Sequence, residues 1–184
     1  ETNRDICAGL LNELGFESFI STNNGISAYI PEKTFDEKAL SDLLDNLPLM
    51  IEHLPQKIVN DKIFPQMVTG FTDVAPVVRE QTLKAVLTVV NKLSDRTVNG
   101  ELLRYLAKTA NDEQPGIRTN TTICLGKIAR NLGANTRTKV LTAAFARSLR
   151  DPFVHARNAA LQALAATADV FSEEDCATKL LPAV

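Results

Sequence analysis

Three Asp–Arg pairs stand out among the residues of this 184-residue sequence that could do chemistry. In each pair the Arg follows the Asp by six positions: Asp73 and Arg79, Asp112 and Arg118, Asp151 and Arg157. A carboxylate beside a guanidinium can act on a substrate, or it can form charge-assisted hydrogen bonds that hold chain segments together. Because the pair recurs at a fixed interval of 39 residues, we favour a structural role between repeats over a catalytic one.

Other reactive residue types do not assemble into a known catalytic or metal-binding pattern. The histidines, His53 and His155, lie far apart, and neither has a second ligand residue at metal-binding spacing. Cys7, Cys124 and Cys176 form no Cys-x-x-Cys pair, which indicates reduced thiols. A Gly-rich phosphate loop and the signature elements of protein kinases are also missing from the sequence. We therefore predict no catalytic residue, no cofactor and no metal in this chain.

The Asp–Arg pairs belong to longer repeated segments with the same period. Residues 73–93, 112–132 and 151–171 read "DVAPVVREQTLKAVLTVVNKL", "DEQPGIRTNTTICLGKIARNL" and "DPFVHARNAALQALAATADVF". Their apolar stripes begin at Leu83, Thr122 and Leu161 and continue at helical spacing. Repetition at a fixed period of this size predicts a solenoid.

Each unit reads as two antiparallel helices joined by the turn that carries the Asp. The first helices have core positions that step by 39 residues: Ile63, Leu102, Leu141 and Leu180, with a second set at Val68, Ala107 and Ala146. Pro76 and Pro115 predict the starts of second helices, because first-turn amides have no intrahelical partner. Pro152 directly follows its Asp instead, so we expect the third turn to have a different shape.

These features predict an all-α fold, a solenoid of antiparallel helix pairs that resembles the HEAT repeat, with about 39 residues per repeat. The array covers residues 40–184, and we expect it to be truncated at both ends because neither end shows the polar cap of a terminal repeat. Residues 1–39 fall outside the register, and a linker, a different module and a poorly continuous segment all stay open for them. Within them, "STNNGIS" predicts a turn or loop.

Charge is distributed unevenly, although the net charge is only −2. Residues 79–157 hold 14 Lys and Arg against 6 Asp and Glu, and the segments on either side are net acidic. Four cations have no basic counterpart 39 residues before or after them: Lys127, Arg130, Arg137 and Lys139. The repeat itself does not require these four residues. They form either a binding patch for an anionic partner or an ordinary solvated surface.

Three segments carry a more specific resemblance. "IFPQMVTGFTDVAPVVREQTLKAVL", "IRTNTTICLGKIARNL" and "TRTKVLTAAFARSLRDPF" resemble the HEAT region of the Scy-like pseudokinases, also called N-terminal kinase-like proteins, over about residues 42–184. The resemblance implies a non-catalytic protein-interaction scaffold that acts in Golgi and coatomer (COPI) vesicle trafficking. It also implies an alternative, a tRNA-associated adaptor in nuclear tRNA export.

The same resemblance implies the partners and the location. The partners would be coatomer or other trafficking proteins, or tRNA and tRNA-export factors. The location would be the cytoplasm, at the Golgi or near nuclear pores. The sequence contains no apolar run of transmembrane length, and it leaves the oligomeric state open.

Overall fold

The computed structural model describes residues 18–22, 25–29 and 51–183. The chain divides into two compact units, Glu1–His53 and Leu54–Val184. The domain boundary between residues 39 and 40 stays a prediction from the sequence.

The first unit contains an antiparallel β-hairpin of strands β1 (Ser18–Thr22) and β2 (Gly25–Tyr29). Ser18 pairs with Tyr29 and Thr22 with Gly25. The expected turn or loop over residues 21–27 is therefore wrong for Ser21, Thr22 and residues 25–27, which belong to the strands. Ile and Thr side chains favour extended backbone, and a hairpin connection needs only two residues. Helical spacing in "ICAGLLNELGF" and the segment after Pro31 also predict helices, and both lie outside the described residues.

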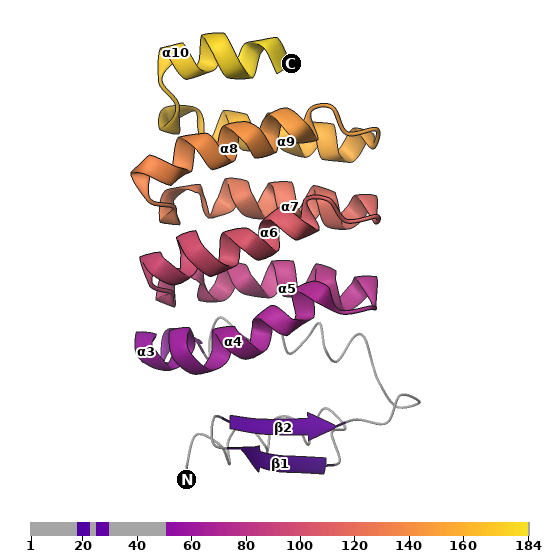
Figure 1. Cartoon of the computed structure of the whole chain (residues 1–184), viewed down its shortest axis with the longest axis vertical. Helices are drawn as coiled ribbons and strands as arrows, with labels where there is room; N and C mark the ends of the chain where they lie inside the picture. The colour runs from indigo at the N-terminus through magenta and orange to yellow at the C-terminus, as the bar shows by residue number, and fades with distance from the viewer. Residues whose placement is uncertain (1–17, 23–24, 30–50, 184) are drawn as a thin grey trace. The chain divides into compact units, whose positions relative to one another are not determined.

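The second unit is a stack of helix pairs, which we call A and B helices in chain order (Figure 1). The first A helix runs through α3 (Gln56–Ile58), a π-helical segment (Val59–Ile63), α4 (Phe64–Met67) and a 3-10 segment (Val68–Thr72). The second joins a π-helical segment (Thr97–Leu102) to α6 (Leu103–Thr109), and the third is α8 (Ala134–Ser148). A last helical run follows, made of α10 (Glu173–Asp175), a π-helical segment (Cys176–Leu180) and a 3-10 segment (Leu181–Ala183).

The B helices are α5 (Pro76–Val89), α7 (Pro115–Lys127) and α9 (Val154–Ala166). Short 3-10 segments extend them: Val90–Lys92, Ala129–Asn131 and Ala168–Val170. The helix α7 packs between α5 and α9, so the B helices form one layer of the stack. The predicted all-α solenoid of helix pairs is confirmed for this unit, and the hairpin is an element that the prediction did not contain.

Each of the three turns between an A helix and its B helix contains an equivalent hydrogen bond, from a backbone amide to the side chain of the turn Asp. The side chain of Asp73 accepts from the Ala75 amide at 2.8 Å, and Asp151 accepts from the Phe153 amide at 2.9 Å. Asp112 accepts from Gln114 in the same way, at 2.9 Å. The expectation of a different third turn is therefore wrong for this bond. The donor is the amide of the second residue after the Asp. Pro152, which lies between Asp151 and Phe153 and has no N–H, therefore does not prevent this bond.

The predicted core stripe of the B helices is buried in the first two repeats only. Its members there are all under 10% exposed: Leu83, Val86, Val90 and Leu93, then Thr122, Leu125, Ala129 and Leu132. The aligned residues of the third repeat are not buried, and Leu161 is 45% exposed. Sequence periodicity marks which face is apolar, but burial requires a neighbouring element on that face.

The second predicted core position of the A helices is buried at Val68 but not at Ala107 or Ala146. Ala107 is exposed, whereas Leu102, Leu106 and Thr109 are buried. Five residues turn an α-helix by about 140° beyond a full turn, so a residue five positions after Leu102 faces away from it. Spacings of four and three residues return to the same face. In the third repeat, Leu141 and Phe145 occupy the positions that correspond to Leu102 and Leu106, and both are buried.

Gly70, at the end of the first A helix, closely approaches the following B helix. A Cβ atom added there would lie 2.2 Å from Oγ1 of Thr82, which donates to the Val78 carbonyl at 2.7 Å. We expect Gly70→Ala to lower the free energy of unfolding by about 1–2 kcal/mol through overpacking. Adding Thr82→Ala should recover part of that loss. Urea unfolding checks this, with Gly100→Ala as the control because a Cβ at Gly100 meets nothing within 4 Å. Equal unfolding midpoints for the two glycine variants would contradict the close approach.

Candidate partner-binding site

The Asp–Arg pairs form a ladder along the turns between A and B helices. Arg79 donates from Nε and Nη2 to the carboxylate of Asp112, at 2.8 and 3.0 Å, and from Nη1 to the Asp73 carbonyl at 2.7 Å. Arg118 repeats this arrangement with the Asp151 carboxylate, at 2.7 and 3.0 Å, and the Asp112 carbonyl, at 2.9 Å. Each of these two arginines therefore ties its own turn to the turn of the next repeat.

The first and last members of the ladder make fewer contacts. Arg157 donates from Nη1 to the carbonyls of Asp151 and Pro152, at 2.8 and 3.0 Å, and binds no carboxylate within the described residues. Asp73 contributes its carbonyl to Arg79, while its carboxylate caps its own turn. The structure thus brings the six residues together in consecutive turns, where their hydrogen bonds go to backbone and to one another. We propose a structural role for all six.

Hydrogen bonding keeps the paired residues charged. The hydrogen bond from Arg118 holds the pKa of Asp151 below its ordinary value, although burial opposes this. Burial of the Asp112 carboxyl also disfavours its charged form. Hydrogen bonds from Arg79 and from the Gln114 amide outweigh that effect, so the pKa of Asp112 is lowered as well. The same side-chain bonds raise the pKa of Arg79 and of Arg118.

These lowered pKa values predict how stability depends on pH. A carboxyl with a folded-state pKa below its unfolded value of about 3.9 stabilises the fold above that value. The stabilisation is lost as pH falls through the folded-state pKa. We expect the free energy of unfolding to fall below about pH 5, and Asp112→Asn to flatten this dependence. Urea unfolding at a series of pH values measures the slope, and an unchanged slope in the variant would rule out Asp112 as a contributor.

The four predicted partner-binding cations differ in exposure and in hydrogen bonding, and their role as a patch stays a prediction. Lys127 and Lys139 are exposed and make no ion pair with a described residue. Arg130 pairs with Asp169 at 3.2 Å, with both side chains largely exposed. Arg137 is half-buried and donates to the carbonyls of Leu132 and Arg130. Only Arg130 and Arg137 line the hollow described next.

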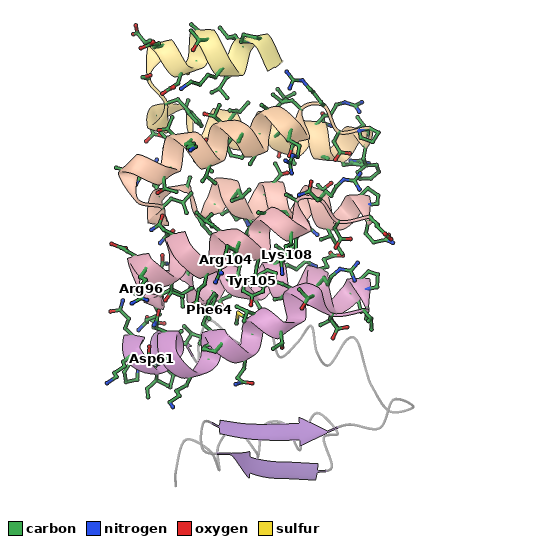
Figure 2. All side chains as sticks on the ribbon, viewed as in Figure 1. Asp61, Phe64, Arg96, Arg104, Tyr105 and Lys108 are labelled. Carbon is green, nitrogen blue, oxygen red and sulfur yellow. The ribbon has the colours of Figure 1, made fainter. Side chains whose placement is uncertain are left out.

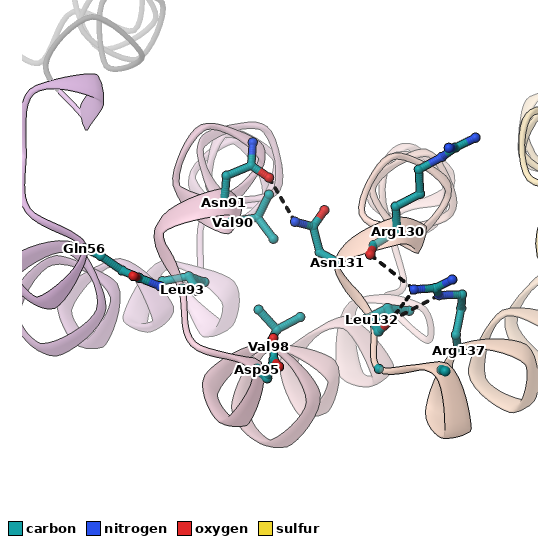
Figure 3. A pocket seen from close by; sticks show the side chains of 12 residues that line it. Gln56, Val90, Asn91, Leu93, Asp95, Val98, Arg130, Asn131, Leu132 and Arg137 are labelled. Carbon is teal, nitrogen blue, oxygen red and sulfur yellow. Dashed lines mark hydrogen bonds between the residues drawn. The ribbon is translucent and has the colours of Figure 1, made fainter.

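A hollow of about 480 Å³ lies beside the segments that connect successive repeats (Figure 3). Its apolar lining comes from Val90, Leu93, Val98 and Leu132. Its polar lining comes from Gln56, Asn91, Asp95, Arg130, Asn131 and Arg137, and Gly133 and Ala134 complete it. The lining residues come from three successive repeats, so the stacking of the repeats creates this concavity.

Asparagines join the repeats along this same edge, which the sequence interpretation missed. Asn60 accepts from the Ser94 amide at 2.9 Å, and Asn99 accepts from the Gly133 amide at 3.0 Å. Asn131 donates to the side-chain oxygen of Asn91 at 2.9 Å. Asn60 and Asn99 lie 39 residues apart, so the repeat period could have indicated that the first two bonds are equivalent.

A second group of cations lies on the A helices (Figure 2). Arg104 and Lys108 are exposed on α6, and the Lys108 amine lies 5.6 Å from the centre of the Tyr105 ring. The Tyr105 ring in turn stacks on Phe71, with centroids 5.5 Å apart. Arg147 on α8 donates to the Asn111 side chain at 2.7 Å. Basic residues therefore occur on both faces of the stack.

Other reactive groups in the described part of the chain give no sign of catalysis. Among those residues, no group of His, Cys, Asp and Glu could hold a metal ion. Burial raises the pKa of the Cys124 thiol to about 12, which makes it unreactive at neutral pH. His155 is exposed beside the Phe153 ring. None of the described helices is long and apolar enough to cross a membrane.

The chain is similar to known proteins over most of its length. Residues 49–182 match the model of the Cnd1 family, described as non-SMC mitotic condensation complex subunit 1. The chain is 42% identical over 172 residues to a probable inactive serine/threonine-protein kinase scy1 of Dictyostelium discoideum, covering 91% of this chain and 21% of that protein. It is 38% identical over 144 residues to Cytoplasmic export protein 1 of Saccharomyces cerevisiae, covering 77% of this chain and 19% of that protein. The chain therefore spans about a fifth of the length of these relatives.

The chain is also similar to a solved structure and, over a short stretch, to a bacterial enzyme. The solved structure described as the crystal structure of Cex1p matches with a TM-score of 0.72 at 37% identity, covering 82% of this chain and 29% of that one. A short stretch of 49 residues, 27% of this chain, is 47% identical to a ribosomal protein L11 methyltransferase of Phocaeicola vulgatus, of which it covers 17%. That similarity covers too little of either protein to assign the methyltransferase activity to this chain.

Proposed function

Because the chain belongs to the Cnd1 family and is homologous to Scy1-like pseudokinases and Cex1p, we propose that it is a non-catalytic protein-interaction scaffold. The observation that carries the proposal is the stack of helix pairs, whose repeats are tied together at both edges and enclose a hollow between them. Arrays of this kind present long continuous surfaces to partners. Residues 51–183 are helical and do not form a kinase domain.

The resemblance to Scy-like pseudokinases supports a finer assignment. On this proposal the scaffold acts in Golgi and COPI vesicle trafficking, and coatomer or other trafficking proteins bind it. Its location would be the cytoplasm, with association to the Golgi. The relative from Saccharomyces cerevisiae is named a cytoplasmic export protein, which supports the cytoplasm.

The alternative is a tRNA-associated adaptor in nuclear tRNA export. The excess of cations in residues 79–157 favours it, as does the export function in the name of the yeast relative. Several exposed cations on the A helices and their ends could contact phosphates: Arg96, Arg104, Lys108, Lys139, Arg147 and Arg150. Since aromatic residues are only 5% of the sequence, contact with the RNA backbone is favoured over base stacking.

Binding measured against salt separates the two functions. The 184-residue chain would be titrated with purified coatomer and with purified tRNA at about 50 and about 200 mM salt. A scaffold is expected to bind coatomer with an affinity that changes little. A tRNA adaptor is expected to bind tRNA and to lose that binding steeply over this range, because phosphate contacts release counterions. Charge reversal of Arg104 and Arg150 should weaken tRNA binding only. Binding of neither partner would contradict both functions.

A further inference from the structure

We propose that the hollow lined by residues 90–98 and 130–137 binds a short acidic peptide of a protein partner. A carboxylate of the peptide binds Arg137, and the peptide backbone contacts the polar lining of the hollow. This inference rests on the proposed scaffold function and names the chemistry of its partner.

The hollow has the volume of a small binding site, with a mostly polar surface over an apolar floor. Its volume of about 480 Å³ lies within the range of about 300–1,000 Å³ that is typical of ligand pockets. Its apolar residues are fixed in the core of the stack, since Val90, Leu93, Val98 and Leu132 are each under 7% exposed. These side chains form the floor of the hollow, and the surface that it presents to a ligand is mostly polar.

Arg137 is a pre-oriented cation at the wall of this hollow. Its Nε and Nη2 donate to the Leu132 carbonyl at 3.1 and 2.9 Å, and Nη2 also reaches the Arg130 carbonyl at 3.3 Å (Figure 3). These neutral acceptors fix the guanidinium without balancing its charge, and Nη1 makes no hydrogen bond to a described residue. Arg79 and Arg118, by contrast, each bind a carboxylate. A ligand carboxylate at Arg137 would supply the counter-charge that the described part of the chain does not.

The other charged groups at the hollow predict the orientation of a bound peptide. Arg130 is held only by an exposed ion pair with Asp169, with side chains 76% and 61% exposed, and such pairs are weak enough to exchange. Asp95 comes from the preceding inter-repeat segment and places one carboxylate in the lining. A peptide would therefore lie with its acidic residue toward Arg137 and with N–H donors or a basic residue toward Asp95.

The asparagine pair favours a peptide over a nucleic acid. Asn131 donates to Asn91 at 2.9 Å, and this bond uses only one group of each amide. The Asn131 oxygen and the Asn91 nitrogen make no other hydrogen bond to described residues. Together they offer one acceptor and one donor, the complement of the N–H and C=O groups of a peptide backbone. The phosphates of a nucleic acid carry no donor for the asparagine oxygen, so contact with the phosphate backbone would leave that oxygen unpaired.

A peptide array tests the proposal directly. The probes are short peptides that each carry one Glu at varied positions, with matched peptides in which Gln replaces Glu. The labelled 184-residue chain is expected to bind Glu peptides with a preferred position at least about 10-fold more tightly than their Gln counterparts. Arg137→Gln should remove that difference. Ala134→Trp, at an exposed position of the lining, should block binding of both peptide sets.

Matched controls separate this site from general charge. Lys127→Glu and Lys139→Glu remove the two predicted cations that do not line the hollow, and both are expected to leave peptide binding unchanged. Circular dichroism of each variant shows whether Arg137→Gln alters the fold, and Ala134→Trp still tests the site if it does. Equal binding of Glu and Gln peptides, or binding that Ala134→Trp leaves intact, would overturn the proposal. So would loss of binding in the two lysine variants, or binding of RNA instead of peptides at the hollow. If the chain binds coatomer but none of the peptides, the peptide site is rejected and the scaffold function is retained.

Discussion

Arg118→Ala is expected to lower the free energy of unfolding by about 3 kcal/mol, because it leaves the carboxylate of Asp151 in the stack without its counter-ion. The side chains of Arg118 and Asp151 are only 19% and 11% exposed, so water replaces the lost bonds poorly. The substitution also removes the hydrogen bonds to the carbonyls of Asp112 and Glu113, which shape the preceding turn. Urea unfolding of the 184-residue chain measures the change.

Two matched variants should change the free energy of unfolding by less than Arg118→Ala does. Arg157→Ala removes hydrogen bonds to two carbonyls and no carboxylate bond, so we expect a loss of about 1 kcal/mol. Lys127→Ala removes an exposed cation without an ion pair and should change the free energy of unfolding by less than about 0.5 kcal/mol. If Arg118→Ala and Lys127→Ala unfold at the same urea concentration, the Asp–Arg ladder does not stabilise the stack.

The ladder could be predicted from the sequence because a solenoid repeats its backbone. With an Arg six residues after each Asp and a period of 39 residues, stacking the turns brings each Arg near the Asp that lies 33 residues further along. The starts of two B helices were predictable for a local reason, since proline suits the first helical turn. Both inferences require only the period and the covalent properties of the residues.

The grouping of the four cations could not be resolved from spacing along the chain. Lys127, Arg130, Arg137 and Lys139 fall within thirteen positions, but the chain changes direction at Gly133 before α8 begins. Arg137 lies in the first helical turns of α8 and reaches back to carbonyls of the preceding segment, whereas Lys139 is exposed. The path of the connecting segment decides this difference, and no period reports that path.

The asparagine bonds at the hollow show a second limit of sequence reasoning. The partners of Asn60 and Asn99 are the backbone amides of Ser94 and Gly133. Every residue except proline carries such an amide, so the identity of the partner leaves no trace in the sequence. Charged pairs are easier to find, because both members must be particular residue types.

The last prediction compares two apolar residues, Leu161 from the predicted stripe and Phe145, which the sequence analysis did not single out. Leu161 aligns with the buried Leu83 in the repeated stripe, yet it is 45% exposed, whereas Phe145 is fully buried between α8 and its neighbours. Phe145→Ala should lower the free energy of unfolding by about 3–5 kcal/mol, because it removes a large buried ring and leaves a cavity.

Leu161→Ala should cost about 1 kcal/mol or less, since much of that side chain already contacts water. Urea unfolding of both variants, followed by helical circular dichroism, gives the two values. Similar losses would mean that another part of the chain covers α9 in solution. A larger loss for Leu161→Ala would mean that the repeat pattern describes the core of this unit better than the observed burial does. The comparison therefore tests whether the apolar stripe or the presence of a neighbouring helix determines the energetic cost at each position.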